Sequence, residues 1–409
     1  MRSLPFVVLV ATTASSFASA QTAPVEMSRE AYVARVVAEG PAARALDDRV
    51  RVARTEARAA GLSPNPSLAW ERGAAVSGAR ADETDDAVTL RLPLVVSGRL
   101  GLAQDAAAAE AAAVELQVRW GRTELRRSAR WAFDAVLAAR ARVSVLDEAV
   151  SEVDALSRLA SLRERAGESA GYESLRIELE AALVADERAA ATADAEHAAV
   201  AAASLLGVSA EALPPLVGDL LTETTDPPPP LEGGERADVK ALSSAAAAAE
   251  LSANAAGRRA VPDPTFTLGA QVLDVAEPGR GTGYVLGVEV PLPVLDGGGR
   301  DADAARAHAR AVQTERQTLS ATAAREGASA RRVFESRRAR LAAFRQNIQG
   351  RAERLRALAD SSWRAGNGDL WALLDAQRAA REARLRVLAL ALEVRNAEAD
   401  LRLALGAEE

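Results

Sequence analysis

The sequence contains no cysteine, only two histidines and few aromatic residues, which make up 3% of its 409 positions. The absence of cysteine excludes disulfide bonds, thiolate metal sites and the acylated cysteine of a bacterial lipoprotein. His197 and His308 lie far apart in the sequence, so we expect no zinc or copper ligand cluster. Scarce aromatic residues beside abundant Ala, Leu and Val favour close helix packing over a bulky globular core.

Long apolar runs are also missing. After residue 20 no segment offers about 18 uncharged apolar residues, so we expect no membrane-spanning helix. The first 20 residues begin with one cation, Arg2, continue through an apolar stretch and end in Ala18-Ser19-Ala20. This pattern is typical of a signal peptide cleaved before Gln21. We therefore expect an exported chain whose membrane attachment comes from its fold.

The charge pattern argues against nucleic acid as a partner, because the net charge is −7. Sets of catalytic residues are also missing: no Ser/His/Asp arrangement or carboxylate pair stands in a plausible cleft. A glycine-rich segment at 279–283 precedes an expected strand rather than a helix, which favours a hairpin loop over a phosphate site. We therefore expect that the chain is not an enzyme and binds no cofactor.

An internal repeat organises the chain, with two copies displaced by 198 to 199 residues. Pro64-Asn65-Pro66 matches Pro262-Asp263-Pro264, and Arg165-Ala166-Gly167 matches Arg364-Ala365-Gly366. A proline-rich linker at 227–234 separates the copies. The predicted repeats therefore span 21–226 and 235–409.

Each repeat is expected to read helix, strand, strand, very long helix, helix. No proline occurs in 94–213 or after Pro293, and both stretches are rich in Ala, Leu, Arg and Glu. The expected helices lie near 99–165, 171–206, 300–364 and 369–406. The longer two would each extend roughly 100 Å at 1.5 Å per residue, which no compact domain can contain. Narrow apolar stripes on these helices predict coiled-coil packing.

Four strands are expected, near 62–72, 86–95, 262–273 and 283–293. Their residues alternate between an apolar face and a polar or small face, as in a strand of a lipid-facing barrel. The predicted lipid-facing residues are Leu68, Trp70, Leu90, Leu92, Phe266, Leu268, Val288 and Val290. The predicted lumen residues are Arg91 and Glu289. Four strands cannot close a barrel, and open edges in lipid are costly, so several chains must share it.

The layout resembles the TolC family of outer-membrane efflux proteins, over Ser28 to Gly406. Its details are most similar to the CzcC-like branch of heavy-metal cation exporters, through Asn65-Pro66-Ser67-Leu68, Arg91-Leu92-Pro93-Leu94, Pro262-Asp263-Pro264-Thr265 and Val290-Pro291-Leu292-Pro293. The resemblance implies an α+β membrane protein: a homotrimer with a 12-stranded barrel, four strands per chain, continued into a periplasmic α-helical tunnel.

The same resemblance implies a tripartite efflux system in the bacterial outer membrane. The partners would be a periplasmic adaptor (membrane fusion) protein, an inner-membrane pump of the RND type and outer-membrane lipid. Heavy-metal cations or small toxic molecules would pass through without covalent chemistry.

The two helical turns are the predicted entrance gate, because relatives close the tunnel there with salt bridges and hydrogen bonds. The gate candidates are Arg163, Arg165, Glu168, Tyr172, Glu173, Arg176, Arg364, Asp369, Trp371 and Asp375. Arg176 and Asp375 occupy equivalent positions of the two repeats and carry opposite charges, so we expect pairs within or between subunits. Solvated helix-end charges are the alternative.

Two other functions remain open at the level of sequence. A periplasmic coiled-coil adaptor or structural protein would share the long hairpins and the signal peptide, but it would not need duplicated lipid-facing strands. The outer component of a protein-secretion system would share the channel fold.

Overall fold

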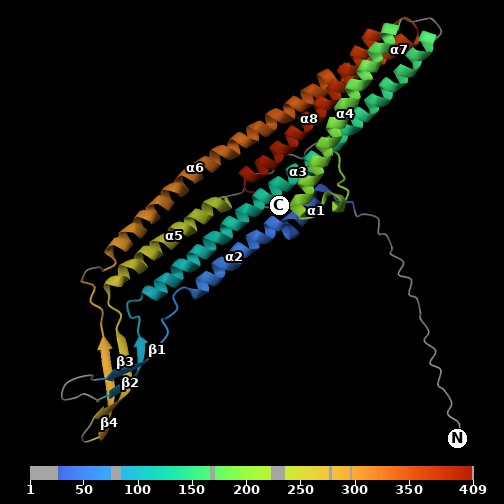
Figure 1. Cartoon of the computed structure of the whole chain (residues 1–409). Helices are drawn as coiled ribbons and strands as arrows, with labels where there is room; N and C mark the ends of the chain where they lie inside the picture. Colours follow the sequence, from blue (N-terminus) through green and yellow to red (C-terminus); the bar gives the residue numbers. More distant parts are fainter. Residues whose placement is uncertain are drawn as a thin grey trace, which may run out of the picture.

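The computed structural model describes residues 26–74, 84–165, 171–222, 235–275, 279–294 and 297–407. The expected signal peptide and the whole proline-rich linker lie outside these ranges. Figure 1 shows an elongated molecule, with long helices side by side, a small sheet at one end and two helical hairpins at the other. Among the described residues, no helix combines the length and apolarity needed to cross a membrane.

Both halves of the chain follow the order helix, strand, strand, long helix, helix, but two helices precede the strands of the first half and the long helix of the second half is divided. The bounds of the first half are α1 Arg29–Glu39, α2 Pro41–Ala59, β1 Ser67–Ala74, β2 Thr84–Pro93, α3 Arg99–Arg165 and α4 Gly171–Leu206. The bounds of the second half are α5 Ala237–Gly257, β3 Thr265–Val275, β4 Gly279–Glu289, α6 Gly299–Phe344, α7 Gly350–Arg364 and α8 Leu370–Ala404. Single 3₁₀ turns lie at Ala210–Ala212 and Arg258–Ala260.

The second long helix is not one regular α-helix. A π-helical segment at Arg345–Gln349 separates α6 from α7, whereas the sequence favoured a continuous helix over 300–364. In the first half, α3 runs without interruption for 67 residues.

Equivalent glycines end the last helix of each half. Gly207 follows α4 with φ 73°, and Gly406 follows α8 with φ 69°. This left-handed conformation is accessible to glycine without strain and lets the N–H groups after the helix bond to its last carbonyls. The N–H of Val208 donates to the Ala203 carbonyl at 3.1 Å, and the N–H of Ala407 donates to the Arg402 carbonyl at 2.9 Å.

A hydrophobic core joins α1, α3 and α4 midway along the molecule. The rings of Tyr32 and Phe133 lie 5.8 Å apart and both are buried. The Tyr32 hydroxyl donates to the Ala202 carbonyl at 2.8 Å, and burial raises the pKa of this phenol. Met27, just before α1, pairs in parallel with Leu216 of the segment after α4. These contacts fix the start of the described chain against the helices.

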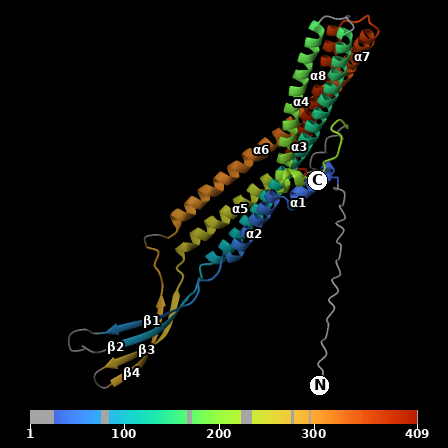
Figure 2. The same ribbon diagram turned by 45° about the vertical axis from the view of Figure 1, so that its right-hand side comes forward.

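The four strands form one antiparallel sheet in the order β1-β2-β3-β4. Leu68 lies opposite Leu90, Leu90 opposite Leu268, and Leu268 opposite Leu286, so one register runs across all four strands. Figure 2 shows the sheet extending from the helices at the end opposite the hairpins. Within the described chain, the outer edges of β1 and β4 have no neighbouring strand.

Candidate functional site at the sheet and the helical tips

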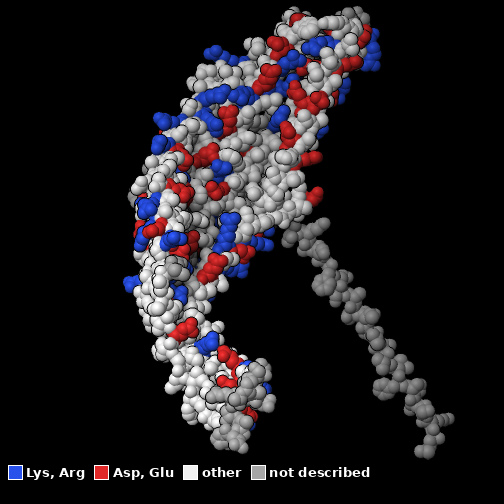
Figure 3. Space-filling model, turned by 60° about the vertical axis from the view of Figure 1, so that its left-hand side comes forward, with Lys and Arg blue, Asp and Glu red and all other residues white. Residues whose placement is uncertain are grey.

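One face of the sheet is apolar and uncovered. Residues directly opposite in antiparallel strands share a face, so the register places seven of the eight predicted lipid-facing residues together, from Leu68 to Val288. Tyr284 and Leu286 extend this face and are 89% and 77% exposed. Val290 lies just beyond β4 and is also exposed. In Figure 3 the sheet end is mostly white, whereas charged side chains cover the helices.

The opposite face of the sheet is mostly polar or small, with Leu273 and Val285 as its larger apolar residues. Arg91 lies on it and contacts Glu71 at 3.4 Å between Nη2 and Oε1. Glu289 occupies the same face at the end of β4, opposite Thr265. Both predicted lumen residues therefore share one side of the sheet, away from the apolar face. Their position in a lumen remains a prediction.

At the junction of sheet and helices, Asp263 connects the two repeats. Its carboxylate accepts from the backbone N–H groups of Val96 and Ser97 at 2.9 and 3.0 Å, and from Arg99 Nε at 2.9 Å. Partial burial opposes ionisation, but the hydrogen bonds from Arg99 and Ser97 prevail and lower the pKa of Asp263. The second repeat thus positions the turn that begins α3, a role that the Pro-Asp-Pro motif alone does not reveal.

At the hairpin tips, the structure brings Tyr172, Arg176 and Trp371 together. The rings of Tyr172 and Trp371 have centroids 6.1 Å apart, and the Arg176 guanidinium carbon lies 5.2 Å from the Trp371 ring centroid. The contact joins α4 to α8, the second helices of the two hairpins. A cation over an indole face is worth about 0.5–1 kcal/mol at an exposed site.

Other predicted gate residues bond within their own helix. Arg165 donates to the Ser161 carbonyl at 3.1 Å, and Arg364 pairs with Asp360 at 3.0 Å. Asp369 precedes α8 as its N-cap residue, without a side-chain capping bond. These three residues do not link the two hairpins within the chain.

The expected ion pair of Arg176 and Asp375 does not form within one chain: among the described residues, no nitrogen of Arg176 lies within 4 Å of a carboxylate oxygen of Asp375. Arg176 stacks on Trp371 instead. Glu173 lies near the start of α4. Glu168 and the side chain of Arg163 lie outside what the structure describes. A pair between subunits remains a prediction.

A larger set of ion pairs crosses between the hairpins farther from the tips. We call it the ion-pair belt; it comprises Glu148 and Glu152 of α3, Glu180 of α4, Glu353 and Arg356 of α7, and Arg378, Arg381 and Arg384 of α8. Its members come from all four hairpin helices. The belt surrounds an apolar cluster that includes Ile177, Val184, Leu373 and Leu374.

Glu180 is the most buried member of the belt, with 2% of its surface exposed. It pairs with Arg378 and, at 3.4 Å, with Arg381, which also lies 3.6 Å from Glu187. The hydrogen bond to Glu180 raises the pKa of Arg378. Because a buried carboxylate is costly unless paired, these contacts tie α4 to α8.

The remaining pairs tie α3 to the second hairpin. Arg356 lies 2.5 Å from Glu152, and Arg384 lies 2.9 Å from Glu148 and 2.5 Å from Glu353. The hydrogen bond from Arg384, opposed by burial and aided by both arginine charges, lowers the pKa of Glu353. These contacts thus keep the Glu353 carboxylate ionised at neutral pH.

The belt was not predicted from the sequence, although one feature of the sequence indicates it. Ile177, Glu180 and Val184 recur at spacings of three and four residues, so Glu180 occupies a position on the apolar stripe of α4. A carboxylate on such a stripe predicts a buried partner. Among the described residues, no group of three or more side chains could hold a metal ion.

Residues 233–407 match the family described as outer membrane efflux protein. This match lies within the second half of the chain. The resemblance predicted from the sequence motifs is therefore confirmed, as is the prediction of an efflux protein rather than an enzyme. The CzcC-like branch stays a prediction. No curated protein matches the chain.

Solved structures share the fold across nearly the whole efflux protein. A membrane protein from Pseudomonas aeruginosa aligns with TM-score 0.77 and 20% identity over 92% of both chains. The outer membrane protein VceC from Vibrio cholerae aligns with TM-score 0.71 and 18% identity over 92% of this chain and 96% of its own. The outer membrane channel CmeC from Campylobacter jejuni gives TM-score 0.76 and 14% identity, over 92% and 85%.

Proposed function

We propose that the chain is one subunit of a homotrimeric outer-membrane channel that passively conducts efflux substrates. The observation that carries this proposal is the sheet, which combines an exposed apolar face with two open edges. Unpaired edge groups cost several kcal/mol each in lipid, so a sheet with this face requires closure. Three sheets of four strands supply the even-numbered closed barrel that bacterial outer membranes accommodate.

The polar face of the sheet lines the proposed lumen. Arg91 and Glu289 place opposite charges there, which suits a water-filled passage better than a binding site of one sign. Substrates enter at the hairpin tips from a periplasmic adaptor and an inner-membrane pump of the RND type. Heavy-metal cations or small toxic molecules are the substrate classes, and the pump selects among them.

The ion-pair belt and the stack of Tyr172, Arg176 and Trp371 hold the entrance closed. Both sets join the first hairpin, α3 and α4, to the second, α7 and α8. An adaptor that binds at the tips would have higher affinity for the separated hairpins than for the associated ones, and it would shift the population toward an open entrance. A further pair of Arg176 and Asp375 between subunits would act in the same direction.

Detergent-purified protein from the outer-membrane fraction tests the channel. Light scattering should give three chains per particle, and the particles should conduct ions in planar lipid bilayers. A water-soluble monomer recovered from the periplasm would contradict the shared barrel. Trimers without conductance, even with the belt broken, would contradict the conducting role.

A further inference from the structure

A strongly cationic groove lies between α1, α3 and α8, midway along the helical part. Its volume is about 640 Å³, within the range of small-molecule sites. Six arginines line it: Arg29, Arg122, Arg126, Arg130, Arg395 and Arg402. The acidic lining residues are Glu30 and Glu398 only. Figure 1 shows α1 far from the sheet, so lipid does not reach this groove in the proposed orientation.

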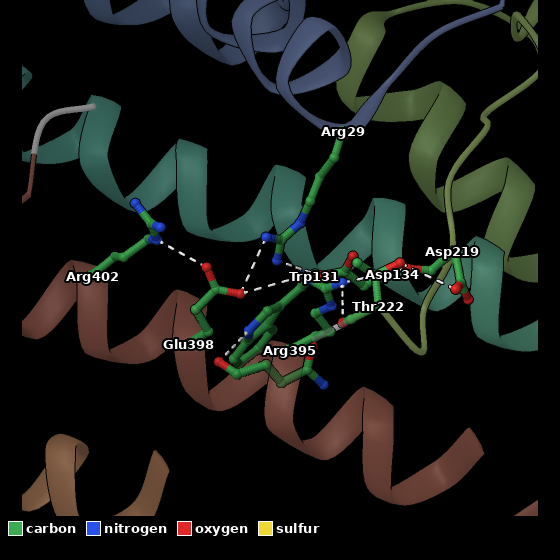
Figure 4. A network of polar contacts seen from close by, with 9 residues as sticks. Arg29, Trp131, Asp134, Asp219, Thr222, Arg395, Glu398 and Arg402 are labelled. Carbon is green, nitrogen blue, oxygen red and sulfur yellow. Dashed lines mark hydrogen bonds and ion pairs between the residues drawn. The ribbon is translucent and has the colours of Figure 1, made fainter. Parts of the chain in front are cut away.

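One side of the groove is partly neutralised. Arg29 bridges Asp134 at 2.5 Å and Glu398 at 3.3 Å, and Arg402 donates to Glu398 at 3.1 Å. Arg395 donates to the Thr222 carbonyl at 3.1 Å and also lies 3.7 Å from Glu398. Figure 4 shows these side chains converging on Glu398 from α1 and α8. One carboxylate thus serves three arginines.

The α3 side of the groove carries the excess charge. Arg122, Arg126 and Arg130 recur every four residues, so their like charges lie on one helix face and destabilise it. Arg122 pairs with Asp47, whereas Arg126 forms no ion pair with any described residue. Burial, followed by repulsion from Arg402 and Arg29, lowers the pKa of Arg130 to about 10. Across the groove as a whole, six arginines stand against two lining glutamates.

Two guanidinium nitrogens support the same conclusion. The Nε atoms of Arg29 and Arg122 are buried and have no hydrogen-bond partner within the described part of the chain. An unsatisfied buried donor is costly, more so when the group is charged. Planar guanidinium groups pair with the oxygens of phosphates and carboxylates in bidentate geometry.

We propose that this groove binds a small soluble oxyanion with several negative charges, through Arg126 and its neighbours on α3. The ligand class is a compact phosphate or polycarboxylate, because a volume of about 640 Å³ holds such a molecule with its first contacts. Bound there, the anion joins α1 to α3 and α8. It thereby stabilises the middle of the helical part, away from both the sheet and the hairpin tips.

Inorganic pyrophosphate is the probe, titrated calorimetrically into the detergent-purified trimer at fixed ionic strength. Saturable binding of one pyrophosphate per chain is expected. Arg126→Gln removes one charge-assisted contact and should weaken binding about tenfold or more. Arg126→Lys keeps the charge but loses the bidentate geometry, so its affinity for pyrophosphate should lie between that of the unaltered protein and that of Arg126→Gln. Arg310→Gln, an exposed arginine of α6, is the matched control and should bind as the unaltered protein does.

The proposal fails if pyrophosphate does not bind saturably to the unaltered trimer, or if Arg126→Gln and Arg310→Gln weaken binding equally. It also fails if Arg126→Gln dissociates the trimer, because the arginine would then belong to a subunit contact. Channel conductance is a separate readout, so failure of this proposal leaves the proposed function intact.

Discussion

Replacing Glu180 by glutamine should open the entrance. The side chain is 2% exposed and pairs with Arg378 and Arg381, both on the other hairpin. Glutamine keeps the shape and one acceptor oxygen but removes the negative charge. Among the described residues, Glu187, at 3.6 Å, would then be the remaining ion-pair partner of Arg381, itself 9% exposed. The substitution therefore weakens the tie between α4 and α8 without creating a cavity.

The size of the effect follows from how well the freed arginines can be solvated. Removing one partner of a fully buried ion pair costs about 3–5 kcal/mol. The cost here is smaller, because the Arg378 side chain is 39% exposed and Arg381 keeps a second carboxylate. We expect about 2 kcal/mol, which changes the ratio of separated to associated hairpins roughly 30-fold.

Planar-bilayer conductance of the purified trimer measures this ratio. Glu178→Gln is the matched control, because Glu178 lies on the same helix but is exposed. Glu180→Gln should raise the open fraction, whereas Glu178→Gln should not. Arg378→Gln should also raise it, and the double variant should have less effect than the sum of the two, because one interaction is lost only once. Equal conductance of Glu180→Gln and Glu178→Gln, with trimers intact, would refute the role of the belt.

Three further predictions concern other parts of the structure. The pKa of Glu353 is lowered, so its pairing with Arg384 contributes its full stabilisation of the associated hairpins above the ordinary pKa of about 4.3, and this stabilisation is lost only as pH falls through the lowered pKa. The conductance of the trimer should therefore not change between pH 7.5 and 5.5, and a rise over that range would contradict the prediction. Asp263→Ala removes the acceptor for two backbone donors and should destabilise the trimer by about 1–3 kcal/mol in thermal unfolding, and an unchanged midpoint would exclude that role. Leu92→Arg on the apolar face should impair membrane assembly by about 2–4 kcal/mol near the midplane, whereas Gln271→Arg on the polar face should not, and equal assembly would reverse the two faces.

Local periodicity explains why the architecture could be predicted from the sequence. Alternation with period two, as in Leu90 and Leu92, depends on neighbours in the same strand. The long helices likewise follow from absent proline and abundant Ala, Leu, Arg and Glu. Both signals need no knowledge of distant residues. The four strands and the mostly helical remainder of the chain could therefore be predicted from the sequence.

The gate contacts could not be predicted in the same way. Arg176 and Asp375 are equivalent in the repeat, but equivalence places two residues at corresponding positions of two hairpins, not in contact. The partner of Glu180 lies 198 residues away at Arg378, and only packing decides which helix faces meet. The guanidinium group of Arg176 lies over the Trp371 ring and does not pair with a carboxylate.

The distribution of charge in the belt determines which of the duplicated hairpins can pack against each other. The first hairpin contributes Glu148, Glu152 and Glu180, whereas α8 of the second contributes Arg378 and its neighbours along the same helix. Two copies of the first hairpin facing each other would bury like charges, which costs several kcal/mol and excludes that pairing. Two copies of α8 would do the same with opposite sign. Because Glu353 is held by arginines of its own hairpin, it does not offset this asymmetry. Divergence of the two repeats thus makes first-to-second pairing the favoured contact within the chain.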